Sequence, residues 1–198
     1  FNSLEVLSKE QSNPFSKNRA CMNIGEAAAI FTVEKNSKEG IDVMGFGETS
    51  DVYHITTPDP NASEEIKAIR LALEDAKITP EDVDYINLHG KGTVANDIME
   101  ARAVSEVFGD KIPCSTTKPL TGHCLGAAAG IELLLCCKLL DDFRGKLYPH
   151  VYDGEYDESL PEIRLVGRND YFNKCEICMC NSFGFGGTNA IMVLGKKE

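Results

Sequence analysis

The sequence predicts an α/β fold in which helices cover both faces of a sheet. Short apolar segments of strand length alternate along the chain with longer helical patterns, and this alternation is typical of layered α/β domains. The last two apolar segments, 177–181 and 190–194, flank a short glycine-rich loop. We therefore expect an antiparallel pair of strands at the end of the chain.

Each earlier element is expected from its own local pattern. Residues 27–33 and 41–46 are apolar and suit strands, the first of them buried. Ser63 offers an N-cap, and apolar residues then recur at spacings of three and four, which indicates an amphipathic helix. Residues 122–140 are the most apolar helix candidate, so this helix is expected in the interior. The remaining expected elements are a strand over 85–88, a helix over 97–108 and a strand over 111–115.

The composition excludes several classes of function. The chain has 198 residues and is 42% hydrophobic, which is enough to bury one core. Its net charge is −11 and it has no run rich in Lys or Arg, so nucleic acid is not an expected partner. No apolar run approaches the roughly 20 residues that span a bilayer, so no membrane partner is expected either. Eight cysteines, several of them within apolar runs, favour a reducing, cytoplasmic setting.

Two histidines and a glycine-rich loop are the most informative residues. His89 begins His-Gly-Lys-Gly-Thr directly after an expected strand, and ligand crevices in α/β folds lie at such strand ends. His123 follows Thr-Gly at the start of the apolar helix, where a neutral imidazole is expected. The loop after Asn181, Asn-Ser-Phe-Gly-Phe-Gly-Gly-Thr-Asn, can add a backbone N–H to the same site. Either histidine could instead be structural, as a lone histidine after a strand often is.

Charged and sulfur-containing residues leave alternatives open. Glu132 lies inside the apolar helix, so it must be paired or protonated, with Lys118 as a natural partner, or else occupy a narrow solvent-facing stripe. The pair Asp97-x-x-Glu100 lies on one helix face, where carboxylates are usually solvated or hydrogen-bonded. The cysteines of 175–180 lack a second ligand pair of matching spacing. We predict no metal site.

Together these motifs resemble the C-terminal half of β-ketoacyl-acyl-carrier-protein synthases of the synthase II type. These are thiolase-like condensing enzymes of fatty-acid and polyketide synthesis. The similarity runs from about Pro14 to Leu194, with weaker support from Gly-Glu-x-Ala-Ala at 25–29 and Asp-x-Tyr-His-x-Thr at 51–56. It implies thiolase-like α/β/α layers around one mixed five-stranded sheet. Residues 1–198, which begin with Phe, would form the C-terminal half, and the N-terminal half with the nucleophilic cysteine would be absent.

The resemblance also implies a reaction. An acyl chain is held as a thioester on a cysteine, a malonyl thioester loses carbon dioxide, and the resulting carbanion attacks the acyl group. His89 and His123 would stabilise the enolate as neutral Nε donors. Lys118 would support them electrostatically and Glu132 would join this buried network. The Phe185 N–H would form half of an oxyanion hole, and its ring would gate the acyl pocket.

Five further positions have implied roles. Thr56, Thr57 and Thr93 would line the pantetheine tunnel, while Asp97 and Glu100 would be structural. No cofactor is implied beyond the phosphopantetheine that carries the substrates. The implied partners are acyl carrier protein, the N-terminal half, and a second subunit in a homodimer or heterodimer.

The chain departs from the family pattern at several places. Many members have threonine where Lys91 stands, and a long cation there could restrict the tunnel or meet an anionic substrate group. Ser16, Ala20 and Cys21 replace Asp, Asp and Gly of the family run, so Cys21 is not the nucleophile. None of the eight cysteines has the strand-to-helix setting of that nucleophile. The chain alone is therefore expected to be inactive.

Two other functions remain possible on sequence grounds. A non-catalytic partner subunit, like the chain-length factors of polyketide systems, would have no chemical need for His89 and His123. A stand-alone carrier-binding module would have to attract acidic carrier proteins, for which a net charge of −11 is a poor match. The residue at the upstream nucleophile position would distinguish an enzyme from a partner subunit.

Overall fold

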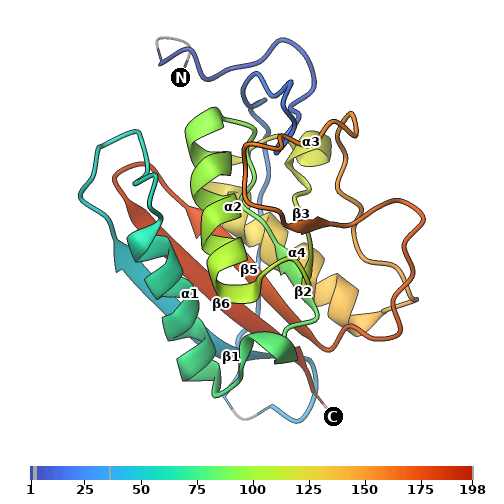
Figure 1. The fold of residues 1–198 in the computed structure, drawn as a ribbon. Helices are drawn as coiled ribbons and strands as arrows, with labels where there is room; N and C mark the ends of the chain where they lie inside the picture. Colours follow the sequence, from blue (N-terminus) through green and yellow to red (C-terminus); the bar gives the residue numbers. More distant parts are fainter. Residues whose placement is uncertain (2–3, 36, 198) are drawn as a thin grey trace.

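A computed structural model describes residues 1, 4–35 and 37–197, and its centre is one mixed sheet. The sheet has six strands in the order β1-β6-β5-β2-β3-β4 (Figure 1). The strands are β1 (Ile41–Ser50), β2 (Tyr85–Asn87), β3 (Pro113–Ser115), β4 (Arg164–Leu165), β5 (Ile177–Phe183) and β6 (Thr188–Lys196). The helices are α1 (Ser63–Ala76), α2 (Val94–Phe108), α3 (Lys118–Thr121) and α4 (Ala128–Asp141), with short 3-10 turns at Pro80–Asp82 and Leu125–Ala127.

The sheet combines an antiparallel and a parallel part. β5 and β6 are antiparallel, which confirms the expected final hairpin, and β1 pairs antiparallel with the other edge of β6. β2 pairs in parallel with both β5 and β3, and β3 with β4. The expected count of five strands is one too low. β4 is only two residues long, too short to produce an apolar pattern in the sequence.

Helices cover both faces of the sheet, as expected. Figure 1 shows α1 and α2 on one face and α4 on the other, and each face has its own apolar core. α1 can lie close to β1 because the strand presents glycines to it. A Cβ at Gly45 or Gly47 would run into the backbone of α1 at Ala72 or Ala68. Such contact explains the Gly-Phe-Gly sequence of this strand.

Two expected elements differ in the structure. Residues 27–33 form no strand, and Ile30 and Val33 are 95% and 84% exposed. The apolar pattern is present there, but a strand requires a neighbour for its N–H and C=O groups, and no described segment provides one. Residues 122–140 are not one helix either. The backbone takes positive φ at Gly122 (71°) and Leu125 (53°), and α4 begins only at Ala128.

No helix within the described residues combines the length and the apolar character needed to cross a membrane.

Candidate active site

The end of β2 holds His89 in a tight turn. The carboxylate of Glu100, on α2, accepts the N–H of His89 at 2.7 Å and the N–H of Gly90 at 2.6 Å. Gly90 has φ 26°, and a Cβ there would lie 2.8 Å from Cγ2 of Thr116. Only glycine fits this turn without displacing a neighbour. Burial raises the pKa of Glu100 to about 7, although its hydrogen bonds oppose that shift.

Asp97 ties the same turn to the N-terminal segment. Its carboxylate accepts the N–H of Phe15 at 2.9 Å and that of Gly92 at 3.2 Å, and Nε of Arg19 lies 3.9 Å away. Burial raises the pKa of Asp97 to about 6. Both acids of Asp97-x-x-Glu100 thus anchor backbone around His89, an arrangement that suits the structural role expected of them.

Lys118 and Glu132 form a buried ion pair next to the histidines. Lys118 begins α3, Glu132 lies on α4, and their side chains are 2% and 1% exposed. The structure therefore pairs Glu132 with the lysine that the sequence suggested, and excludes the solvent-facing alternative. Burial raises the pKa of Glu132, and the positive charge of Lys118 opposes the shift.

The rings of His89 and His123 meet edge to face, with centroids 5.2 Å apart and an interplanar angle of 85°. Neither ring nitrogen of His89, nor Nδ1 of His123, has a hydrogen-bond partner among the described residues. Burial is the main cause that lowers the pKa of both imidazoles, and the charge of Lys118 adds to it. The pKa of His89 falls well below 6.5 and that of His123 falls to about 3. Both rings are therefore neutral at physiological pH and can each donate one N–H.

A cavity of about 270 Å³ opens in front of the two imidazoles. Phe185 is 38% exposed on its wall, and the ring of Phe1 stacks on it at 5.9 Å. Nζ of Lys91, which also lines this cavity, lies 4.6 Å from the centre of the Phe185 ring. The lining residues are Phe1, Met22, His89, Lys91, His123, Leu125, Gly126 and residues 182–185.

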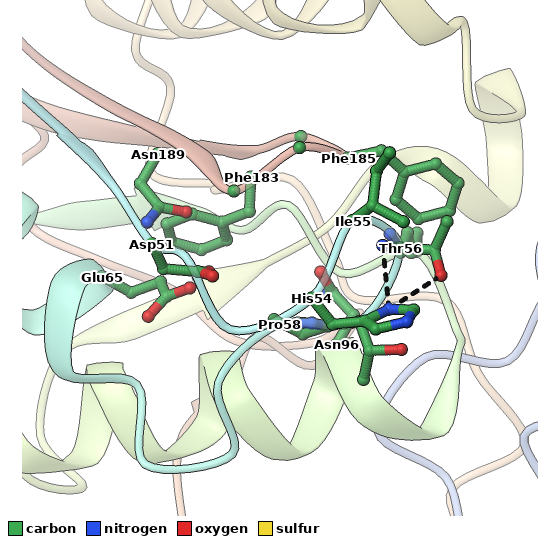
Figure 2. Close-up of a pocket in the computed structure, with 15 residues that line it drawn as sticks. Asp51, His54, Ile55, Thr56, Pro58, Glu65, Asn96, Phe183, Phe185 and Asn189 are labelled. Carbon is green, nitrogen blue, oxygen red and sulfur yellow. Dashed lines mark hydrogen bonds between the residues drawn. The ribbon is translucent and has the colours of Figure 1, made fainter.

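A second, narrower cavity contains Thr56 and Thr57. Figure 2 shows Thr56 hydrogen-bonded to Nδ1 of His54, with Phe185 close by. The two cavities share Lys91 and residues 183–185 as a common wall. Thr93, the N-cap residue of α2, is half-buried and is not among the residues that line either cavity.

Glu65 is a buried residue of this second cavity that the sequence reasoning missed. It is 0% exposed, and neither carboxylate oxygen has a hydrogen-bond partner in the part of the chain that the structure describes. Burial raises its pKa to about 7, and nearby Asp51 contributes to the shift. The sequence pattern could have revealed it, because Glu65 precedes the buried Ile69 and Leu73 by one and two helical turns and so lies on the same face of α1.

The cysteines lie away from the imidazoles or are protected by burial. Cys178 and Cys180 belong to β5 and pack with Cys136 in the core beneath α4. Cys124 follows His123, and burial raises the pKa of its thiol. Among the described residues, no group of three or more His, Cys, Asp or Glu side chains is placed to hold a metal ion.

Comparison with known proteins adds three findings. The model of the family "Beta-ketoacyl synthase, C-terminal domain" matches residues 42–150. The 3-oxoacyl-[acyl-carrier-protein] synthase 2 of Coxiella burnetii is 37% identical over 95% of this chain and 47% of its own length. Nodulation protein E of Rhizobium leguminosarum bv. trifolii is 36% identical over 97% of this chain and 49% of its own length. The chain therefore spans about half the length of the curated relatives it matches.

Solved structures show the same fold. A chain of the complex between a ketosynthase (ApeO) and its chain length factor (ApeC) from Xenorhabdus doucetiae superimposes with a TM-score of 0.87. It is 38% identical, and the match covers 99% of this chain and 49% of that one. A β-ketoacyl synthase from Burkholderia phymatum STM815 has a TM-score of 0.86 and 27% identity, covering 100% of this chain and 51% of that one. The thiolase-like fold that the motifs implied is thereby confirmed.

Proposed function

Because this chain belongs to the β-ketoacyl synthase family, as its C-terminal domain, we propose that it supplies the decarboxylating half of a condensing active site. The reaction joins a malonyl unit on acyl carrier protein to an acyl chain held on a cysteine. The C–C bond to the malonyl carboxylate breaks, carbon dioxide leaves, and the electron pair forms an enolate. The enolate carbon then attacks the acyl thioester, and the cysteine thiolate leaves.

The observation that carries this proposal is the pair of neutral imidazoles facing one cavity. Decarboxylation places negative charge on the thioester oxygen, and preorganised N–H donors in a dry site stabilise such charge strongly. His89 and His123 have free ring nitrogens beside the cavity and a lowered pKa, so each can donate to that oxygen. A neutral donor keeps its proton throughout the step.

The neighbouring residues support this role. The ion pair of Lys118 and Glu132 places a fixed positive charge near both imidazoles, which disfavours their protonation. Phe185 forms the boundary between the two cavities, where its N–H would contribute to an oxyanion hole and its ring would gate the acyl pocket. Thr56 and Thr57 would line the pantetheine tunnel from the narrower cavity. Thr93 lines neither cavity, so the described residues offer no contact that supports the tunnel role implied for it.

We further propose that residues 1–198 are the C-terminal half of a longer synthase whose N-terminal half supplies the nucleophile. The chain spans 47% of the Coxiella relative. Burial raises the pKa of the thiol of Cys124, the cysteine next to His123, so it is a poor nucleophile. The extended apolar segment 27–33 exposes Ile30 and Val33, a surface that a second half of the protein would cover.

The proposed partners follow from this activity. Acyl carrier protein would deliver both substrates on phosphopantetheine, so no free cofactor is needed, and the reaction would take place in the cytoplasm. The full-length protein would pair with a second subunit, as the ApeO ketosynthase does with its chain length factor. A non-catalytic partner role is disfavoured because such a subunit has no use for two unpaired imidazoles at a cavity.

Mass spectrometry and carbon dioxide release test this function together. Full-length protein incubated with octanoyl-pantetheine should gain one acyl group on a cysteine outside this chain, and malonyl-pantetheine should then release carbon dioxide. The chain of residues 1–198 incubated alone should gain none. An acyl group on any of the eight cysteines of this chain, or carbon dioxide release that persists without both histidines, would refute the proposal.

A further inference from the structure

The side chain of Lys91 is buried, but its ammonium reaches the wall of both cavities and makes no ion pair among the described residues. The side chain is 6% exposed, and none of the ion pairs or side-chain hydrogen bonds among the described residues includes its Nζ. Its one polar contact is with the face of the Phe185 ring, 4.6 Å away. Burying a charge without a counter-charge is costly, so such a group is expected to meet an anion from outside the chain or to lose its proton.

The charged groups near Lys91 are already engaged. Asp97 and Glu100 attract its charge, but each accepts backbone N–H bonds from the loop that it anchors. Lys118 is already paired with Glu132. The two imidazoles are neutral, so the ammonium of Lys91 is the one charged side chain among the described residues that line the larger cavity.

Lys91 is placed where it can meet a substrate. It lines both cavities and lies within the wall that separates them. An anion in the larger cavity would have the ammonium on one side and the N–H donors of His89 and His123 on the other. Neutral imidazoles would donate to that anion, and no negatively charged side chain lines this cavity.

We propose that the Lys91 ammonium binds a carboxylate of the substrate inside the larger cavity. The inference rests on the proposed function and names a determinant of its substrate. A carboxylate fits better than a phosphate, because one lysine among Phe1, Met22 and Phe185 offers a single charge, whereas a phosphate dianion needs several donors. Two carboxylates could bind here: that of the malonyl unit, and one at the far end of the acyl chain.

The residue type at this position supports the inference. A neutral side chain at this position, such as a hydroxyl, would offer no charge with which to select for an anion. Lysine supplies the charge and reaches the cavity wall through its four methylenes, whose burial accounts for the small exposure of the side chain.

Calorimetric binding to full-length protein at pH 7 tests the proposal, with pantetheine amides as probes because the amide bond resists turnover. Wild type should bind the malonyl amide at least about tenfold more tightly than the acetyl amide. Lys91→Met should abolish that preference while binding the acetyl amide as wild type does, and Lys91→Arg should keep most of it. Lys67→Met removes one exposed charge from α1 and serves as the matched control, with no effect expected.

A second pair of probes separates the two sources. If the carboxylate is that of the acyl chain, the octanoyl amide and its ω-carboxylate analogue will show the Lys91-dependent preference, and the malonyl pair will not. The proposal is overturned if Lys91→Met leaves the preference for the carboxylate-bearing probe unchanged in both the malonyl/acetyl pair and the ω-carboxylate/octanoyl pair. These binding measurements do not require the protein to catalyse a reaction. If the protein shows the Lys91-dependent preference but releases no carbon dioxide, the proposed function is refuted and the carboxylate site is not.

Discussion

His89 and His123 lie with their ring centroids 5.2 Å apart, although they come from different elements of the fold. His89 follows β2 and is held by Glu100 of α2, whereas His123 lies between α3 and the turn that precedes α4. His123 is also fixed from a third direction, because its N–H donates to the carbonyl of Asn23 at 2.7 Å. The site is therefore preorganised by three separate segments of the chain.

Replacing either imidazole should reduce decarboxylation. We expect His89→Ala or His123→Ala in the full-length protein to lower kcat for carbon dioxide release by about 10²–10³, the usual effect of losing one donor to a developing oxyanion. Transfer of the acyl group to the cysteine should change much less, which separates a catalytic loss from misfolding. Equal losses in both half-reactions would argue that the imidazoles serve the fold.

Removing one partner of the buried ion pair should destabilise the protein much more than replacing both partners. Glu132→Ala leaves the Lys118 ammonium buried without a partner and should lower the free energy of unfolding by about 3–5 kcal/mol. Replacing both residues, Lys118→Met with Glu132→Leu, should recover most of that loss, because no charge then remains buried. Urea unfolding measures the change in the free energy of unfolding for each variant. The single variants Lys118→Met and Glu132→Leu complete the cycle, and a double variant as destabilised as the sum of these two would contradict coupling between the residues.

Glu65 predicts a loss of stability as the pH rises. Its folded pKa of about 7 lies above the ordinary value of 4.5, so between these values the native state holds a proton that the unfolded state releases. The stabilisation is complete below pH 4.5 and is lost as the pH rises to about 7. Glu65→Gln should reduce the slope of this dependence, to which the raised pKa values of Asp97 and Glu100 also contribute, and unfolding measured from pH 4 to 8 checks it. Glu74→Gln, an exposed change on the same helix, should leave it in place.

Lys91 predicts that carboxylate binding weakens at alkaline pH. Burial lowers its pKa from 10.5 to about 8, so the ammonium form declines as the pH passes that value. The preference for the malonyl over the acetyl amide should fall between pH 7.5 and 9.5. Asp97, with a pKa of about 6, is ionised across this range, and Glu100, with a pKa of about 7, completes its ionisation at the lower end, where its growing negative charge favours the ammonium and so opposes the predicted fall. If the preference for the malonyl amide stays constant from pH 7.5 to 9.5, a group other than Lys91 is responsible for it.

Local motifs predicted much of the site, because its residues lie next to elements that the sequence pattern reveals. The glycines after His89 indicated a turn at the end of a strand, and the acid within the apolar helix suggested Lys118 as a partner, a pairing that the structure shows. Asp97 and Glu100 were assigned to structure from the family pattern, and their bonds to backbone N–H groups suit that assignment.

Other features depend on contacts between segments far apart in the chain. The apolar segment 27–33 has the composition of a strand, but strand formation depends on a neighbour, and no described segment pairs with it. The helix expected over 122–140 begins only at Ala128, because the backbone of His123 pairs with residues 23–25 instead of continuing a helix. No local pattern contains this information.

By itself, the sequence determined the layered α/β class, the final hairpin, the two imidazoles and the family, because periodicity and motif are properties of short segments. Only the tertiary structure decided which groups share a cavity. It placed Lys91 against Phe185 without an anion and left Glu65 without a hydrogen-bond partner. Burial and pairing depend on what the rest of the chain brings near a residue, and a charge in a sequence does not reveal whether water or protein surrounds it.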